Sequence, residues 1–132
     1  MMTDEHDLWR EIEQTWGFVP EWFKNLPPET MAAEWGLLKN REIDDSPIPN
    51  KYRQLIGIAV AAQMQCPYSV AYHTEVARLC GATPEEIEDA ALMAKHTAGW
   101  GTYLRGTQAE LETFKREVRE VCDAVVAKER AA

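Results

Sequence analysis

The stretch from Lys51 to Ala62 constrains the fold of this chain most, because it is apolar over most of a helix's circumference. A helix of this kind has to be covered by protein on nearly all sides. We therefore expect it to lie in the middle of a helical bundle or between the subunits of an oligomer.

Helix start and stop signals divide the first part of the chain. Asp4 can cap a first helix that ends at Gly17, and a short apolar segment follows over residues 18–23. A further helix is predicted from Pro28 to Asn40, because the apolar residues there repeat on one face. The segment over residues 41–50 is rich in Asp and Pro and is predicted to be a loop.

The second part of the chain carries equally regular signals. One helix is predicted from Cys66 to Cys80, and a capping box at Thr83–Glu86 opens another that is expected to reach His96. A second capping box over residues 107–110 predicts a last, amphipathic helix through residues 111–125. Because no β-hairpin signal occurs, we expect an all-α, single-domain bundle of about six helices that forms an oligomer.

Length and charge limit the classes of partner. The chain has 132 residues, which suits one domain over residues 1–132. Its 14 basic and 22 acidic residues leave a net charge of −8, which disfavours nucleic acid and anionic membrane surfaces. The first residues are acidic, unlike a targeting peptide, so we expect a cytoplasmic protein. A small molecule or another protein remains as the partner.

The three cysteines do not form the framework of a disulfide-rich domain. Cys66 and Cys80 are predicted at opposite ends of one helix, about 21 Å apart at 1.5 Å per residue. A disulfide needs Cα atoms within about 7 Å of each other. The two thiols therefore cannot pair within the helix, and a reducing compartment fits best.

The segment from Cys66 to His73 contains the candidate chemistry. In a helix that opens at Cys66, residues 66, 69 and 73 share one face, so Cys66, Ser69 and His73 are predicted neighbours. Free backbone N–H groups and the helix dipole favour a thiolate at the helix start. His73 is placed to exchange a proton with the group at position 69. The same residue types also fit a buried small thiol and a hydrogen-bonded core histidine.

Three segments together resemble the alkylhydroperoxidase-D-like/carboxymuconolactone decarboxylase family. They are residues 17–39, the run from Gln54 to Ala62 followed by Cys66-Pro67-Tyr68-Ser69 and His73, and residues 81–87. The resemblance covers about residues 17–125. It implies an all-helical fold that assembles into dimers, trimers or hexamers.

In the peroxidase branch of that family, a glutamate precedes a Cys-x-x-Cys pair and a histidine follows the second cysteine by four residues. Carried over to this chain, Cys66 takes the place of the first cysteine and His73 that of the histidine. Ser69 stands where the attacking cysteine is expected, and Gln54 stands where the glutamate is expected. A serine does not reduce peroxide and a glutamine does not accept a proton as a carboxylate does, so the standard route lacks two groups.

Three functions therefore remain open. The first is a thiol-dependent, peroxidase-like oxidoreductase, in which Cys66 is oxidised by a peroxide, His73 shuttles a proton, and an external thiol restores the cysteine. Ser69 and Gln54 are then polar residues of the pocket. The second is an acid–base enzyme that acts on a small organic acid or lactone through His73. The third is a non-catalytic helical oligomer.

Other side chains are candidates for the same pocket. The second function needs a group that binds an anion, and the candidates are Arg53, Arg78 and Arg105. His96 is a candidate to line the pocket beside His73, and the alternative is a capping role near the end of its helix. The chain has no dinucleotide fingerprint, phosphate-binding loop or paired metal-ligand motif, so neither a cofactor nor a metal is expected.

Overall fold

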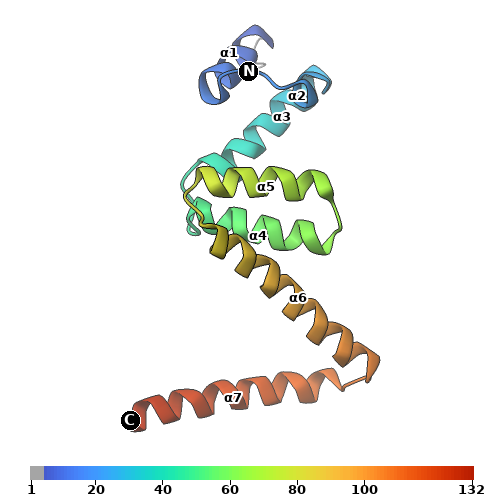
Figure 1. Ribbon diagram of the computed structural model, residues 1–132, viewed down its shortest axis with the longest axis vertical. Helices are drawn as coiled ribbons and strands as arrows, with labels where there is room; N and C mark the ends of the chain where they lie inside the picture. The colour runs from blue at the N-terminus through green and yellow to red at the C-terminus, as the bar shows by residue number, and fades with distance from the viewer. Residues whose placement is uncertain (1–4) are drawn as a thin grey trace.

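The computed structural model describes residues 5–132, and within that range the chain is helical and has no strand (Figure 1). The elements are α1 (Glu5–Trp16), α2 (Glu21–Lys24), α3 (Pro28–Leu38), the π-helical turn η1 (Lys39–Ile43), α4 (Asn50–Gln63), α5 (Pro67–Leu79), α6 (Pro84–Gly106) and α7 (Leu111–Ala131). This architecture confirms the all-α prediction. The cap predicted at Asp4 lies outside the described residues.

The first three helices pack around an aromatic core. The buried members of this core are Leu8, Ile12, Val19, Phe23, Met31 and Trp35. Trp16 covers them from one side, and its ring meets Trp35 edge-on with 4.9 Å between the ring centroids. The core holds the end of α3 in place, and the chain enters η1 from there.

Helices α4 and α5 form an antiparallel pair in the middle of the molecule (Figure 1). Their core is small, with Ile58, Ala77 and Ala82 buried between them and the start of α6. Helix α4 contacts both α5 and α6, which agrees with the central position predicted for it. Its apolar surface is not fully covered in one chain, because Ile56 and Val60 remain half exposed.

The predicted loop over residues 41–50 is only partly a loop. The chain continues from α3 through the π-helical turn Lys39–Ile43, so the prediction was wrong for residues 41–43. The backbone N–H of Asp44 donates to the carbonyl of Lys39 over 2.7 Å, which closes the wider turn of a π-helix. Because of this turn, Glu42 lies against α4.

Helix α6 begins as predicted and ends later than predicted. The Thr83 hydroxyl accepts from the Glu86 N–H and the Glu86 carboxylate accepts from the Thr83 N–H, at 3.1 and 3.0 Å. The helix then runs past His96, through Gly99, to Gly106. The expected end at His96 was wrong because a glycine inside a helix costs only about 1 kcal/mol and does not by itself end it.

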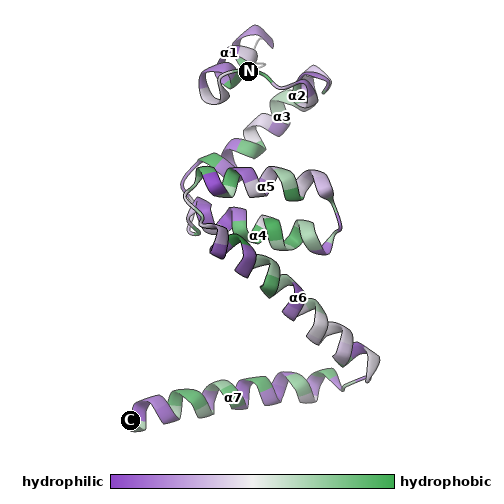
Figure 2. Ribbon diagram, in the orientation of Figure 1, coloured by the Kyte–Doolittle hydropathy of each residue, from purple (hydrophilic) through white to green (hydrophobic). Residues whose placement is uncertain are grey.

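Helix α7 begins at a different cap from the predicted one. Thr107 ends α6, and its hydroxyl donates to the carbonyl of Tyr103. Gln108 then takes a positive φ of 55°, and the carboxylate of Glu110 caps α7 by accepting from two backbone N–H groups. Apolar and polar residues alternate along α7 with helical spacing (Figure 2), and none of its residues is buried.

The described part of the chain carries no helix that is long and apolar enough to cross a membrane.

Candidate active site

A cavity of about 610 Å³ lies where α3, η1, α4 and α5 meet. Three of the four predicted site residues, Gln54, Ser69 and His73, line it. The remaining lining residues are Trp22, Glu34, Leu37, Leu38, Arg41, Glu42, Arg53, Ile56, Gly57, Val60, Ala61, Met64 and Tyr72. The cavity therefore combines apolar walls with one concentrated group of polar side chains.

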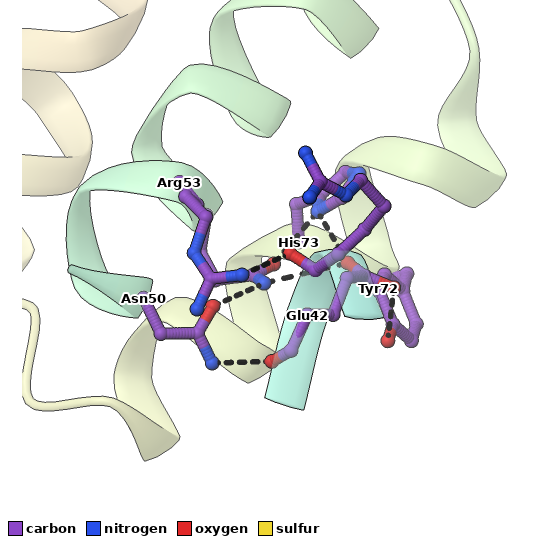
Figure 3. Close-up of polar contacts among 7 residues, drawn as sticks. Glu42, Asn50, Arg53, Tyr72 and His73 are labelled. Atoms are coloured by element: carbon purple, nitrogen blue, oxygen red, sulfur yellow. Dashed lines mark hydrogen bonds and ion pairs between the residues drawn. The ribbon is translucent and has the colours of Figure 1, made fainter. Parts of the chain in front are cut away.

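Gln54 is the centre of that polar group. Its side chain is 1% exposed, and its amide nitrogen donates to Asn50 Oδ1 at 3.0 Å and to Glu42 Oε1 at 3.3 Å. Its amide oxygen lies 2.8 Å from Nδ1 of His73. Figure 3 labels the partners Glu42, Asn50 and His73, which come from η1, α4 and α5. A buried amide with all of these partners is held in one orientation.

The network also determines which nitrogen of His73 carries the proton. The Asn50 amide nitrogen donates to the backbone carbonyl of Glu42 over 2.5 Å, and a carbonyl can only accept. Asn50 Oδ1 must therefore accept from Gln54, which leaves the Gln54 oxygen facing His73. Nδ1 of His73 has to donate to that oxygen. Nε2 is then the nitrogen with a free lone pair and can act as a base.

Glu42 and Tyr72 complete the group. The Tyr72 hydroxyl donates to Glu42 Oε2 at 2.9 Å, and Glu42 Oε1 lies 3.7 Å from Nδ1 of His73. Burial, together with the nearby Glu42 charge, raises the pKa of the Tyr72 phenol well above its usual range. Tyr72 therefore stays protonated and serves as a hydrogen-bond donor.

Gly57 provides the space for the His73 ring. A Cβ atom at position 57 would stand 2.5 Å from Nδ1 of His73, closer than real Cβ contacts come. The imidazole therefore packs directly on the backbone of α4. A glycine in the middle of an apolar helix is costly unless something approaches it closely, which was a signal available in the sequence.

Cys66 does not line the cavity itself, but it contacts Ser69, which does. It precedes α5 as the N-cap residue, and its Sγ is 3.4 Å from the Ser69 hydroxyl oxygen. Hydrogen bonds to the thiolate lower the pKa of this thiol, first from the Ser69 hydroxyl and then from the Ser69 backbone N–H. Cys66 is not among the described residues that line the cavity. Ser69 links the thiol to the cavity wall.

Of the three candidate arginines, Arg53 reaches the cavity. Its guanidinium donates to the backbone carbonyls of Arg41 and Asp44, the latter at 2.8 Å. Arg78 instead pairs with Glu75 at the exposed surface, and Arg105 donates to a carbonyl of its own helix. Arg53 therefore both binds the end of η1 and places a positive charge on the cavity wall.

His96 does not share the cavity of His73. It lies in a separate hollow of about 710 Å³ whose lining residues, Leu92, Lys95, His96, Gly99, Trp100 and Tyr103, all belong to α6. In the single chain His96 does not join the His73 pocket, because it lies on a different face of α6 from Met93, Ala94, Thr97 and Ala98, which lie beside α4. One helix provides no opposite wall, so this hollow is an open surface in the single chain. Within residues 5–132, no three His, Cys, Asp or Glu side chains group as metal ligands.

Comparisons with known proteins agree on the fold. Residues 28–109 match the family described as "Carboxymuconolactone decarboxylase family". The alkylhydroperoxidase AhpD core of Rhodospirillum rubrum is a similar solved structure, with a TM-score of 0.72 and 22% identity over 80% of this chain and 81% of that one. A Burkholderia xenovorans protein, named as a candidate carboxymuconolactone decarboxylase, gives a TM-score of 0.60 and 24% identity over 73% and 80%.

A sequence relative is less informative about function. "Uncharacterized protein 4 in cox locus" of Paracoccus denitrificans is 34% identical over 65 residues. The match covers 49% of this chain and 59% of that protein, so the chain spans less than two thirds of its relative's length. The family match, by contrast, contains every residue of the polar network from Glu42 to His73.

Proposed function

Because the chain belongs to the carboxymuconolactone decarboxylase family, we propose that it catalyses proton transfer on a small organic acid or lactone bound in the His73 cavity. One observation carries the proposal. The hydrogen bond between His73 and the oriented Gln54 places a proton on Nδ1, so that Nε2 is the basic nitrogen of the neutral imidazole, on a residue that lines a cavity. An imidazole in that state is a general base, and its protonated form is a general acid.

The residues of the cavity suit a decarboxylation. When a substrate carboxylate leaves as carbon dioxide, the electron pair of the broken C–C bond stays on the substrate carbon. Protonated His73 gives its Nε2 proton to that carbon and forms the C–H bond. Neutral His73 then takes a proton from water, and the hydroxide that remains combines with the carbon dioxide to give bicarbonate. Every atom and charge of this step is accounted for without a cofactor.

The walls support a small substrate with one charged end. A volume of about 610 Å³ is in the range of small-molecule sites. Leu37, Leu38 and Ile56 offer apolar surface, whereas Arg53 contributes a positive charge that favours a carboxylate. Ser69 adds a hydroxyl that can bind a carbonyl or carboxylate oxygen.

The test is turnover of carboxymuconolactone, which is measured as the release of carbon dioxide. We expect His73→Gln to lower kcat by about 100-fold or more, since general acid–base catalysis contributes roughly 10²–10⁴. The matched variant Cys66→Ala removes the thiol from the same helix and should keep the rate within about threefold, since Cys66 takes no part in this proton transfer. Equal rates for wild type and His73→Gln would refute the proposal.

A specific observation favours a second function, because the pKa of the Cys66 thiol is lowered. In this alternative, the Cys66 thiolate attacks a hydroperoxide oxygen, the O–O bond breaks, and the alkoxide that leaves takes a proton from protonated His73. The resulting sulfenic acid condenses with an external thiol and releases water, and a second external thiol then frees Cys66 and leaves as a disulfide. Peroxide consumption in the presence of added thiol, at equal rates in wild type and Cys66→Ser, would remove Cys66 from the mechanism.

The third function, a helical oligomer without catalysis, is the outcome if neither assay responds to His73→Gln or Cys66→Ser. The two assays therefore separate all three functions.

A further inference from the structure

We propose that Glu42 is the positioning carboxylate of the His73 site: through Gln54 it orients the imidazole, and its charge stabilises the imidazolium formed during proton transfer. The inference rests on the proposed function, because it assigns Glu42 a part in the same reaction. Position 54, where the family resemblance places a carboxylate, is a neutral glutamine in this chain. Glu42 comes from η1 and brings a negative charge to the same group of side chains.

The contacts of Glu42 support a role beyond packing. One carboxylate oxygen accepts from Gln54 and lies 3.7 Å from Nδ1 of His73, and the other accepts from Tyr72. Within the described residues, the ion pair that Glu42 makes is the one with His73. The guanidinium of Arg53 is directed to backbone carbonyls instead. The positive charge that Glu42 can meet is therefore the one that His73 carries after it takes a proton.

The surroundings strengthen this electrostatic interaction. The side chains of His73 and Glu42 are 24% and 20% exposed, so both are largely removed from water. Charges in such a setting are screened less than charges at the surface. A preorganised carboxylate beside a catalytic imidazole acts by holding the tautomer and by stabilising the imidazolium.

Helix α4 fixes the turn that carries Glu42. Asn50 donates to the carbonyl of Glu42 itself, and Arg53 donates to the carbonyls of Arg41 and Asp44 on either side of it. These groups are carbonyls at the end of a helical turn, which need donors from outside the turn. Side chains from the first turn of α4 therefore hold η1 where it presents Glu42 to Gln54, and π-helical turns are frequent at functional sites.

The first experiment compares kinetics with carboxymuconolactone. Glu42→Gln keeps the shape and removes the charge, and we expect kcat to fall by about 10–100-fold with KM changed by less than about threefold. Glu42→Asp restores the charge. It should recover at least about a third of the decrease in log kcat that Glu42→Gln causes. Glu75→Gln is the matched control, because it removes an equal charge from the exposed face of α5, where Glu75 pairs with Arg78. Wild-type kcat in Glu42→Gln would overturn the proposed role of the charge.

The second experiment does not depend on turnover. In full-length protein labelled with ¹⁵N-histidine, we expect the His73 ring to carry its proton on Nδ1. Asn50→Ala should keep this tautomer, because Glu42 Oε1 still accepts from Gln54, whereas Asn50→Ala combined with Glu42→Leu removes both acceptors of the Gln54 amide and should shift a clear fraction to the Nε2–H form. An unchanged tautomer in the double variant, or a shift already complete in Asn50→Ala, would overturn the positioning role. If wild type is inactive, the proposed reaction fails, and this spectrum still decides whether Glu42 positions His73.

Discussion

The body of the molecule, residues 5–83, and the arm formed by α6 and α7 are built from opposite patterns of burial (Figure 1). The body buries the rings of Phe23 and Trp35 and even a polar side chain, Gln54. The arm has no buried residue in either helix, and apart from Ile87, which packs on the α4–α5 core, its large apolar side chains are mostly exposed. The difference indicates that the body can fix a site within one chain, whereas the arm leaves most of its apolar surface uncovered in one chain.

The exposed area supports the same conclusion for the arm. A compact monomer of 15.0 kDa exposes about 7,000 Å² of surface, whereas this chain exposes 10211 Å². The excess of roughly 3,000 Å² per chain, or about 6,000 Å² over two copies, is as large as the most extensive homodimer interfaces. The apolar stripe of α7 consists of Leu111, Phe114, Val118, Val121 and Val125. We propose that a second copy of the chain covers it.

The largest expected effect is the loss of assembly when charges are placed on that stripe. Val118→Asp combined with Val125→Asp should convert an oligomer into monomer, because each buried valine contributes about 1.5–3 kcal/mol and a buried unpaired charge costs more. Arg116→Gln combined with Ala127→Asp makes the same change of net charge on the opposite face of α7 and should leave the assembly unchanged. Light scattering on the purified proteins measures the result. A wild-type monomer, or equal masses for both double variants, would contradict the comparison.

The second prediction contrasts two glycines inside helices of the body. Gly57→Ala should destabilise the protein by about 1–3 kcal/mol, because the new methyl group overlaps the His73 ring. Gly36→Ala, in the middle of α3, meets open space and should stabilise it by up to about 1 kcal/mol. Denaturant unfolding gives both values. If Gly57→Ala were as stabilising as Gly36→Ala, His73 would not pack on α4 as described.

The residues of the candidate site differ in how far the sequence could predict them. Ser69 and His73 follow from helical spacing, because both lie on one face of a helix whose start is marked by Cys66-Pro67. Glu42 could not be predicted in this way. Its position depends on a π-helical turn held by side chains from α4, and the local sequence has only the Asp- and Pro-rich composition of a loop.

Helix boundaries were predictable where hydrogen bonds between neighbouring residues set them. They were less predictable where the rest of the structure sets them. The capping box at Thr83–Glu86 was found because its two hydrogen bonds are local. The prediction of a second capping box was wrong, because Gln108 continues the turn and Glu110 is the residue that caps α7. The end of α6 was missed at His96, because the glycines that follow it are tolerated in an exposed helix.

A third and smaller effect compares a thiol of the body with a thiol of the arm. Ser69→Ala removes the hydroxyl that most lowers the pKa of the Cys66 thiol, so that pKa should rise. The thiolate fraction near neutral pH then falls, and alkylation of Cys66 by iodoacetamide should slow by about three- to tenfold. Cys122, exposed on α7, is the internal reference and should react at the same rate in both proteins. Mass spectrometry of the labelled peptides separates the two sites.

One measurement tests most directly whether the function belongs to the body. A small carboxylic acid or lactone is titrated into the protein while the ring signals of its three histidines are followed by NMR. The account predicts that His73, in the cavity of the body, shifts with saturation and that His96, in the hollow on α6, does not. A saturable shift of His96 with His73 unchanged would place the ligand on the arm and contradict the account.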